Sequence, residues 1–348
     1  MKNKNYYIIP IFVPHLGCQY QCIFCNQQKI TGKERGKYPS TDEIEEKIHS
    51  YLSIMPAGKK TVELAYYGGS FTALPLSLQS ELLLPAYKAV KRGIINKIRL
   101  STRPDCLNDM IIKNLLKFQV TTVELGVQSF SDQVLNLARR GHSSQDVYKA
   151  VELLRKNHFQ IGIQLMVGLP GETDQDLEQS IKQTIKLKPD FVRIYPVLVI
   201  DGTELAELFK QGLYNPLTLE QAVNKVKKMV LAFKKANIPV IRVGLQVTEE
   251  LSEGSAVLAG PFHPAFRHLV ESELYKDKLV FYLKNREEKN WIIQVHPRDI
   301  SNVRGIYNSN LKYVEEKLKK KIVQVRKNEG IPRGELVLTA YLDAKDDH

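Results

Sequence analysis

Short apolar, β-rich runs alternate with segments of helical period along residues 7–243, and this alternation limits the chain to a few folds. Successive βα units are typical of a parallel sheet. Six or seven units of roughly 30–40 residues favour a barrel or partial barrel over an open sheet. We therefore predict an α/β fold with a partial, TIM-like (β/α)6-type barrel. The predicted strands are Tyr7–Val13, Val62–Tyr67, Lys97–Ser101, Thr121–Gly126, Ile161–Val167, Phe191–Tyr195 and Val240–Val243.

The helical segments lie between these strands, and several begin with a capping residue. Ser40 is followed three residues later by Glu43, and Thr173 precedes Asp174 and Asp176 in a first turn. The predicted helices are Ser40–Ile54, Ser77–Lys91, Leu107–Phe118, Ser143–Asn157, Thr173–Leu187 and Thr218–Ala236.

The alternation ends after about Leu245, where a second region begins. Residues Thr248–His268 contain several Gly and Pro, which predicts loops, and a helix candidate follows at Ser301–Lys319. We predict two domains, a barrel in residues 1–245 and a small α+β accessory or substrate domain in residues 246–348. The strand candidates of the second region are Leu279–Lys284, Trp291–His296, Ile322–Arg326 and Glu335–Tyr341.

Basic residues are in excess over the whole chain and are concentrated within residues 312–333 of this second region. The chain has 50 Lys plus Arg against 38 Asp plus Glu, a formal net charge of +12, and residues 312–333 hold eight Lys or Arg and three Glu. Such a patch is either a solvated face or a surface that contacts phosphates. Net charge bears on solubility and steering, so it is compatible with an RNA partner without establishing one.

The 348 residues include no run near the roughly 20 apolar residues that a bilayer-spanning helix needs. The best run, Phe191–Ile200, is interrupted by Arg193 and Pro196. The run Tyr6–Val13 carries Pro10 and suits a strand better than a signal sequence. We expect a cytoplasmic protein with no membrane partner, whose oligomeric state the sequence does not set.

Three of the four cysteines, Cys18, Cys22 and Cys25, lie within eight residues of one another. A clustered trio in a long chain indicates metal or cluster ligation rather than a disulfide framework. An iron–sulfur cubane held by three cysteines leaves one iron open, whereas a structural zinc site normally has four protein ligands. A fourth ligand from His15 or from Cys106 would make the loop a structural zinc site, so both alternatives stay open at this point.

Polar and glycine-rich segments follow the predicted strands at their carboxyl ends, where barrel enzymes place their sites. Each segment alone is explained by a tight turn, loop punctuation or a buried amide. Together, on the rim that also carries the cysteine loop, they indicate the walls of one site. The segments are Gly68–Thr72, Ser101–Asp105, Gly126–Ser129, Gly168–Glu172 and Tyr195–Pro196.

These residues resemble the radical S-adenosylmethionine (radical SAM) enzymes, whose signature is three cysteines at these spacings with an aromatic residue, here Phe24, before the last. Further segments are similar to the elongator catalytic-subunit branch of that family and, less closely, to oxygen-independent coproporphyrinogen dehydrogenases. The similarity covers most of residues 5–245. The matching segments are Gly68–Phe71, Thr102–Asp105, Val123–Ser129, Arg140–His142, Ile194–Pro196 and Val199–Leu205.

The resemblance implies a 4Fe-4S cluster on Cys18, Cys22 and Cys25, with S-adenosylmethionine chelated at the open iron and cleaved to a 5′-deoxyadenosyl radical. It also implies an external one-electron reductant of the ferredoxin or flavodoxin type. No substrate-activating catalytic residue is assigned, and Cys106 has no assigned role. The residues implied to bind S-adenosylmethionine are Phe24, Gly68, Gly69, Ser70, Gln128, Arg140, Val167 and Tyr195.

All of these residues except Ser70 have a stated role in the resemblance. The two glycines would let the backbone approach the methionine amino group, and Phe24 would pack against the adenine. Gln128 would offer amide hydrogen bonds, and Arg140 would meet the carboxylate through its planar fork. Backbone at Val167 and near Tyr195 would line the adenine edge.

Departures from the family pattern narrow the expected substrate. Ser101 and Gln164 stand where many relatives carry an acidic residue, and the elongator subunit usually has a wider first cysteine gap. The chain ends at His348 without room for the acetyltransferase domain that the elongator subunit carries, so we do not expect a modification that uses acetyl-coenzyme A. RNA remains the expected substrate class.

Three functions follow from these observations. The first is a radical SAM enzyme that acts on RNA, tRNA in particular. The second is the same chemistry on a porphyrin or other small metabolite, with His263, His268 and Tyr275 as residues of its pocket. The third is a non-catalytic, metal-binding nucleic-acid-binding module.

Overall fold

The structure is a computed structural model that describes residues 5–13, 18, 21–26, 29, 38–245 and 256–341. It divides into two compact units. The first unit comprises residues 1–219 with residues 230–264, and the second comprises residues 220–229 with residues 265–348. This division places residues 220–229, part of one helix, with the second unit, whereas we had expected the whole helix to belong to the barrel.

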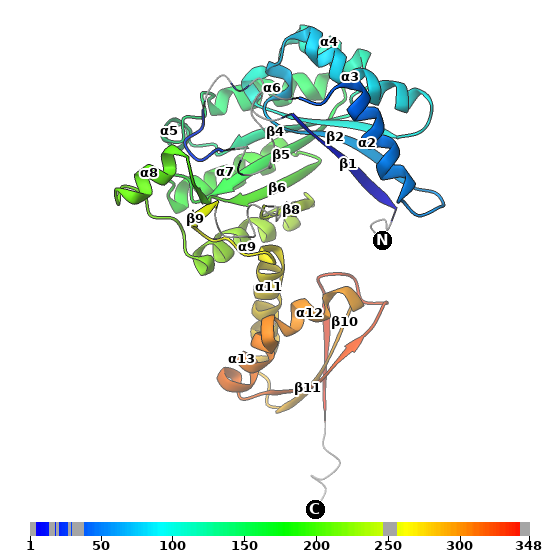
Figure 1. Cartoon of the computed structure of the whole chain (residues 1–348). Helices are drawn as coiled ribbons and strands as arrows, with labels where there is room; N and C mark the ends of the chain where they lie inside the picture. Colours follow the sequence, from blue (N-terminus) through cyan, green and yellow to red (C-terminus); the bar gives the residue numbers. More distant parts are fainter. Residues whose placement is uncertain are drawn as a thin grey trace, which may run out of the picture. The chain divides into compact units, whose positions relative to one another are not determined.

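The first unit is built on a seven-stranded sheet in which every neighbouring pair is parallel. The strand order β1-β2-β3-β4-β5-β6-β8 follows the order of the chain, and the sheet curls into a half-barrel with helices packed on its outside (Figure 1). The predicted partial barrel is therefore confirmed. Its strands are β1 Tyr6–Val13, β2 Thr61–Gly68, β3 Lys97–Thr102, β4 Thr122–Gln128, β5 Gln160–Val167, β6 Phe191–Pro196 and β8 Val240–Val243.

All six predicted helices of this region are present, with ends within two residues of those predicted. They are α2 Thr41–Ser53, α3 Leu76–Lys91, α4 Asp109–Lys117, α6 Ser144–Lys156, α7 Asp174–Leu187 and α9 Leu219–Lys235. Ser40 and Glu43 form the expected capping box: the Glu43 backbone N–H donates to Ser40 Oγ at 3.2 Å, and the Ser40 N–H donates to Glu43 Oε2 at 2.7 Å. Thr173 and Asp176 form a second capping box at the start of α7.

Smaller elements were not predicted. Two short helices, α5 Asp132–Leu137 and α8 Glu204–Lys210, lie next to the site described below. Strands β7 Val199–Ile200 and β9 Val257–Ala259 form an antiparallel pair. Strand β9 lies within the stretch predicted to be loops, and residues 248–255 of that stretch lie outside the described residues.

The second unit is a three-stranded sheet with helices, which confirms the predicted α+β class. Strand β10 Asn290–Val295 lies between β11 Lys321–Lys327, to which it is parallel, and β12 Leu336–Ala340, to which it is antiparallel. Its helices are α11 Phe266–Leu283, α12 Ile300–Arg304 and α13 Ser309–Leu318.

The strand predicted at Leu279–Lys284 is wrong, because these residues form the last turns of α11. The run Leu-Val-Phe-Tyr-Leu has the composition of a strand, but its buried residues continue the four-residue spacing of Tyr275, Leu279 and Leu283. This spacing places them on one helical face.

The single helix predicted at Ser301–Lys319 is also wrong in part. It is broken between α12 and α13, where Gly305, Tyr307 and Asn308 all have positive φ. An uninterrupted helix requires negative φ at each residue. Among the described residues, no helix is both long and apolar enough to cross a membrane.

Candidate functional site

A cavity of about 320 Å³ lies at the carboxyl ends of strands β2 to β5 in the first unit. This volume falls within the range of small-molecule sites. Three of the rim segments expected from the sequence meet there with the cysteine loop. The lining residues are Cys18, Gln21, Cys22, Cys25, Asn26, Gly68, Gly69, Ser70, Ser101, Thr102, Arg103, Glu124, Leu125, Gly126, Gln128, Arg140, Gln164 and Gly202.

All three clustered cysteines line this cavity. Cys22 is buried, and Cys18 and Cys25 are half-buried. A turn joins the last two, in which the Cys25 N–H donates to the Cys22 carbonyl oxygen at 3.1 Å. Cys106 does not line the cavity, and His15 lies outside the described residues. Among the described lining residues, therefore, there is neither a fourth thiol nor an imidazole.

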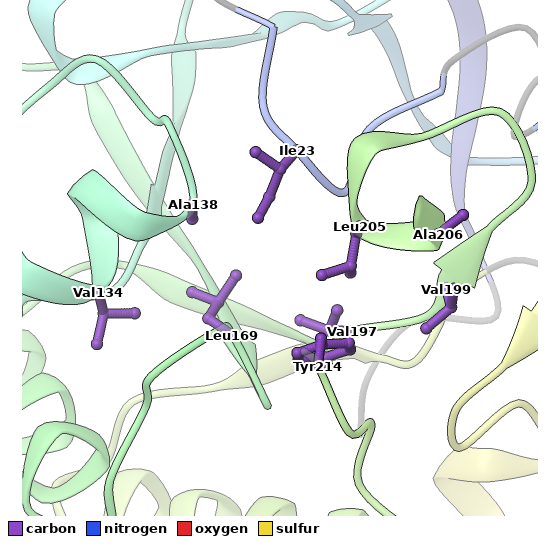
Figure 2. Close-up of a cluster of buried hydrophobic side chains, with 9 residues drawn as sticks. All are labelled: Ile23, Val134, Ala138, Leu169, Val197, Val199, Leu205, Ala206 and Tyr214. Carbon is purple, nitrogen blue, oxygen red and sulfur yellow. The ribbon is translucent and has the colours of Figure 1, made fainter. Parts of the chain in front are cut away.

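Ile23 anchors the cysteine loop to the barrel. Its side chain enters an apolar cluster with residues from α5, α8 and the loops after β5 and β6 (Figure 2). Its backbone is also held, because the Ile23 N–H donates to the Ala138 carbonyl at 3.3 Å and the Leu205 N–H donates to the Ile23 carbonyl at 2.8 Å. Phe24 packs against the same cluster and does not line the cavity.

The thiols are chemically suited to a metal centre. Burial, followed by the neighbouring Cys22 and Cys18, raises the pKa of Cys25 to about 12. A thiolate at that position therefore needs a cationic partner, and a coordinated metal deprotonates a thiol outright. In the described part of the chain, no three Cys, His, Asp or Glu side chains are gathered tightly enough to hold a metal ion as they stand. The donor set of three thiols fits a cluster, and ligation would require the three sulfur atoms to converge.

Arg140 connects the cysteine loop to strand β4. Its Nη1 donates to Cys22 Sγ at 3.0 Å, and its Nη2 donates to the Gly126 carbonyl at 2.6 Å. The side chain is only 7% exposed, and its Nε has no hydrogen-bond partner among the described residues. The guanidinium therefore brings a buried positive charge to the wall of the cavity.

Gln128 reaches the cavity through an irregularity at the end of β4. The pairing of β4 with β5 shifts register between Gly126 and Gln128, and Gln128 has a φ of +68°. Its Oε1 accepts a hydrogen bond from Gln164 Nε2 at 3.3 Å. A Cβ on Gly126 would lie 3.1 Å from Gln128 Nε2 and 3.3 Å from Arg140 Nη2, so the glycine leaves space for both side chains.

Gly68 and Gly69 form the cavity wall beside β1. Gly68 has a φ of +114°, and the Gly69 N–H donates to the Val13 carbonyl at 2.9 Å. A Cβ on Gly68 would lie 2.8 Å from that carbonyl oxygen. The pairing of β1 with β2 therefore requires glycine at position 68 whether or not a ligand approaches. Ser70 follows, 3% exposed, with its Oγ 3.9 Å from Cys18 Sγ.

Glu124 adds a carboxylate to the cavity that sequence reasoning missed. Its Oε1 pairs with Arg99 Nη1 at 2.6 Å, and its Oε2 pairs with Arg193 Nη1 at 2.5 Å. Arg99 also pairs with Glu63 at 2.5 Å, so two buried carboxylates and two guanidiniums join strands β2, β3, β4 and β6. Charged residues inside predicted buried strands were the signal for this network, because such groups are buried only when paired.

Arg103 is a second lining residue that was not predicted as a ligand contact. It is 4% exposed, and its Nε and Nη2 donate to the two carboxylate oxygens of Asp105 at 2.9 and 2.6 Å. This bidentate geometry fixes the side chain at the wall of the cavity.

Besides Phe24, two further expected binding residues, Val167 and Tyr195, do not line the cavity. Val167 is fully buried, and its carbonyl accepts the Val197 N–H at 2.9 Å. Tyr195 is 7% exposed, with its ring centroid 5.3 Å from the Arg193 guanidinium. In the second unit, His268 Nδ1 lies 2.6 Å from Asn302 Oδ1, and Tyr275 is 4% exposed within an apolar core.

Two family models match the chain in sequence order. The Radical SAM superfamily model matches residues 12–184, and the Radical_SAM C-terminal domain model matches residues 189–276. The chain belongs to the radical SAM superfamily, and its relatives include the elongator-type proteins that the sequence motifs indicated.

The curated relatives share part of this chain. The tRNA uridine(34) acetyltransferase of Methanocaldococcus jannaschii is 30% identical over 255 residues, which cover 63% of this chain and 46% of that protein. The heme chaperone HemW of Lactococcus lactis is 28% identical over 215 residues, which cover 61% of this chain and 53% of that protein. The chain thus spans about half the length of these relatives.

A solved structure with the same fold is that of Methanocaldococcus infernus Elp3 with an N-terminal deletion. It matches with a TM-score of 0.62 and 23% identity, over 79% of this chain and 63% of that one.

Proposed function

We propose that this chain is a radical SAM enzyme that holds a 4Fe-4S cluster on Cys18, Cys22 and Cys25 and acts on RNA, tRNA in particular. The observation that carries the proposal is that three thiols line one cavity whose described lining offers no fourth thiol or imidazole. When bound there, the cluster and S-adenosylmethionine would supply a 5′-deoxyadenosyl radical for hydrogen abstraction.

The residues of this chain would bind and shield that cofactor. Arg140 would hold the cysteine loop against β4 through its contacts to Cys22 and Gly126, and its charge would offset thiolate charge. The amides of Gln128 and Gln164 would hydrogen-bond polar groups of S-adenosylmethionine, beside the backbone of Gly68 and Gly69. The position of Phe24 in the apolar cluster favours a role in fixing the loop over direct contact with the adenine.

Two observations support RNA as the substrate class. Relatives at 30% identity carry the name tRNA uridine(34) acetyltransferase, and the chain has a formal net charge of +12. An excess of cations attracts polyanions and speeds their encounter with a protein. The reductant would be an external one-electron donor of the ferredoxin or flavodoxin type.

The cluster is tested by iron content and by release of 5′-deoxyadenosine from S-adenosylmethionine after anaerobic reconstitution with a reductant. Cys18→Ser, Cys22→Ser and Cys25→Ser should each abolish the release and lower bound iron. Cys106→Ser, a matched control outside the cavity, should retain both. Zinc near one equivalent without iron in the wild type would instead establish a structural metal site.

The substrate is tested by mass spectrometry of tRNA nucleosides from cells with and without this protein. The proposal expects one modified nucleoside to be lost in the deletion strain and to return with the wild-type gene but not with Cys22→Ser. Unchanged nucleosides, together with active release of 5′-deoxyadenosine, would reject RNA while preserving the radical chemistry.

A further inference from the structure

The sheet of the second unit has two chemically different faces. One face carries Trp291, Ile293 and Val295, which pack in an apolar core with side chains from α11, α12 and α13. These helices lie to one side of the sheet (Figure 1). The opposite face carries the alternate residues of each strand, because successive side chains of a strand point to opposite faces.

The strand register defines this opposite face, which we call the outer face. Gln324 and Thr339 flank Ile292, while Arg326 and Val337 flank Gln294. Asn290 pairs with Lys321, and the Tyr341 N–H donates to the Asn290 carbonyl at 2.8 Å. At these described positions the outer face has two cations, several amides and hydroxyls, and no carboxylate.

The cations of the outer face lie on β11, which is an edge strand. Lys321 and Arg326 are exposed. Lys327 is also exposed but pairs with Val295 of the core face, and Lys319, the C-cap of α13, precedes the strand. None of these four forms an ion pair within the described part of the chain. Arg326 Nε donates to Gln324 Oε1 at 2.8 Å, and that neutral partner leaves the charge uncompensated.

Exposed apolar groups lie among these cations. Tyr341 is 40% exposed, Val337 is 47% exposed, and Val323, at the register shift in β11, is 43% exposed. A sheet face with an aromatic ring, amide groups and cations that form no ion pair with the described residues has the chemistry that single-stranded nucleic acid needs. Cations meet phosphates, the ring stacks on a base, and amides reach base edges.

We propose that the outer face binds a single-stranded segment of RNA. Lys321 and Arg326 contact the phosphates, and Tyr341 stacks on a base. The inference rests on the RNA substrate class proposed above and adds which unit holds that substrate: the outer face belongs to the second unit, whereas the cysteine-lined cavity belongs to the first. The absence of acidic residues from the described outer positions favours a polyanion over a basic protein segment as the occupant.

The test measures binding of a labelled 12-nucleotide single-stranded RNA and of unfractionated tRNA by fluorescence anisotropy at several salt concentrations. The double variant Lys321→Glu/Arg326→Glu loses two phosphate contacts. For the single strand, the negative slope of log K against log salt should therefore become shallower by about 1.4. Tyr341→Leu should weaken binding about fivefold or more and leave that slope unchanged. A duplex RNA of equal length should bind more weakly than the single strand and lose little affinity in Tyr341→Leu.

The matched control is Lys113→Glu/Lys182→Glu, which makes the same change in net charge on exposed positions of α4 and α7. Thermal melting and release of 5′-deoxyadenosine without RNA check that each variant retains its fold and cofactor site.

If wild type binds RNA but the outer-face and control variants lose affinity equally, the inferred surface is wrong and the RNA substrate stands. If wild type binds neither RNA, both proposals fail. Equal binding of RNA and heparin, unaffected by Tyr341→Leu, would reduce the face to a nonspecific anion surface and overturn the inference.

Discussion

At the level of single residues, Gly68 shows how a strand contact shapes the cavity wall. Its φ is +114°, and a Cβ there would lie 2.8 Å from the Val13 carbonyl oxygen. Gly58 has a similar φ of +109°, but a Cβ there would meet no atom within 4 Å. Both alanine variants incur backbone strain of about 1–3 kcal/mol, and only Gly68→Ala adds the close contact.

We therefore expect Gly68→Ala to lower the free energy of unfolding by more than Gly58→Ala does, in urea titrations followed by circular dichroism. Gly68→Ala should also reduce release of 5′-deoxyadenosine, because the wall of the cavity must move. Equal losses of stability in the two variants would show that β1 and β2 absorb the side chain without cost.

His142 should make stability depend on pH. The side chain is 6% exposed, and in the neutral ring Nε2–H donates to the Val127 carbonyl at 3.2 Å. Burial, followed by the charge of Arg140, lowers the pKa of His142 to about 4. In the unfolded chain its pKa is near 6.5, so between these values the unfolded state binds more protons than the folded state. Stability is therefore complete above about pH 6.5 and falls as pH drops towards 4.

This loss should reach roughly 2–3 kcal/mol for the apo protein between about pH 7.5 and about pH 4.5. Urea titrations at the two pH values measure it, and His142→Gln should remove this part of the pH dependence. His158→Gln, which changes an exposed histidine, is the control. A pH dependence that is the same in wild type and His142→Gln would refute the assignment.

The candidate site was predictable where a motif fixes the residue type. The cysteines, Gly68, Gly69, Ser70, Gln128 and Arg140 all line the cavity, because the strand-to-helix connections of a parallel sheet converge at one edge. Phe24, Val167 and Tyr195 have positions near that edge but side chains committed to packing. The direction in which these three side chains point depends on local strand and loop geometry, and the spacing of residues along the chain does not reveal that geometry.

At the level of elements, the ion pairs of Glu124 join the strands of the half-barrel. Glu124 is 2% exposed and meets both Arg99 and Arg193. Removing one partner of a buried pair leaves an uncompensated charge and costs about 3–5 kcal/mol. We expect Glu124→Gln to lower the free energy of unfolding by about that amount, measured by urea titration.

An exposed ion pair of similar geometry gives the control. Arg139 and Glu204 pair at 2.6 Å, but their side chains are 63% and 40% exposed. Glu204→Gln should cost less than about 1 kcal/mol, because water screens such a pair. If the two variants lose the same stability, the buried network does not hold the strands together.

The sheet strands and the longer helices of the first unit were predictable, because each combines a regular hydrophobic period with a turn or capping signal at its ends. In the second unit, β10, β11 and β12 were predicted, but the prediction failed at Leu279–Leu283, which has strand composition but helical burial. Composition alone does not distinguish a buried strand from a buried helical face, and the deciding contacts come from β10, which follows in the chain. The break at Gly305 was likewise hidden, because a single glycine within a helical pattern often leaves the helix intact.

At the level of the whole molecule, the two units have separate apolar cores. The only tryptophan of the chain, Trp291, is 4% exposed and lies in the core of the second unit. Its fluorescence therefore reports the unfolding of that unit, whereas far-ultraviolet circular dichroism reports helices of both units. Two probes coincide only when a chain unfolds as one cooperative system.

We expect Gly68→Ala, a change in the first unit, to shift the circular dichroism transition to lower urea and to leave the Trp291 transition in place. Val314→Ala, which removes a buried side chain from the second core, should shift the Trp291 transition by about 1–3 kcal/mol. If both probes shift together in both variants, the units unfold as one. Helix α9 would then be the element that couples them, because residues 220–229 belong to the second unit and residues 230–235 to the first.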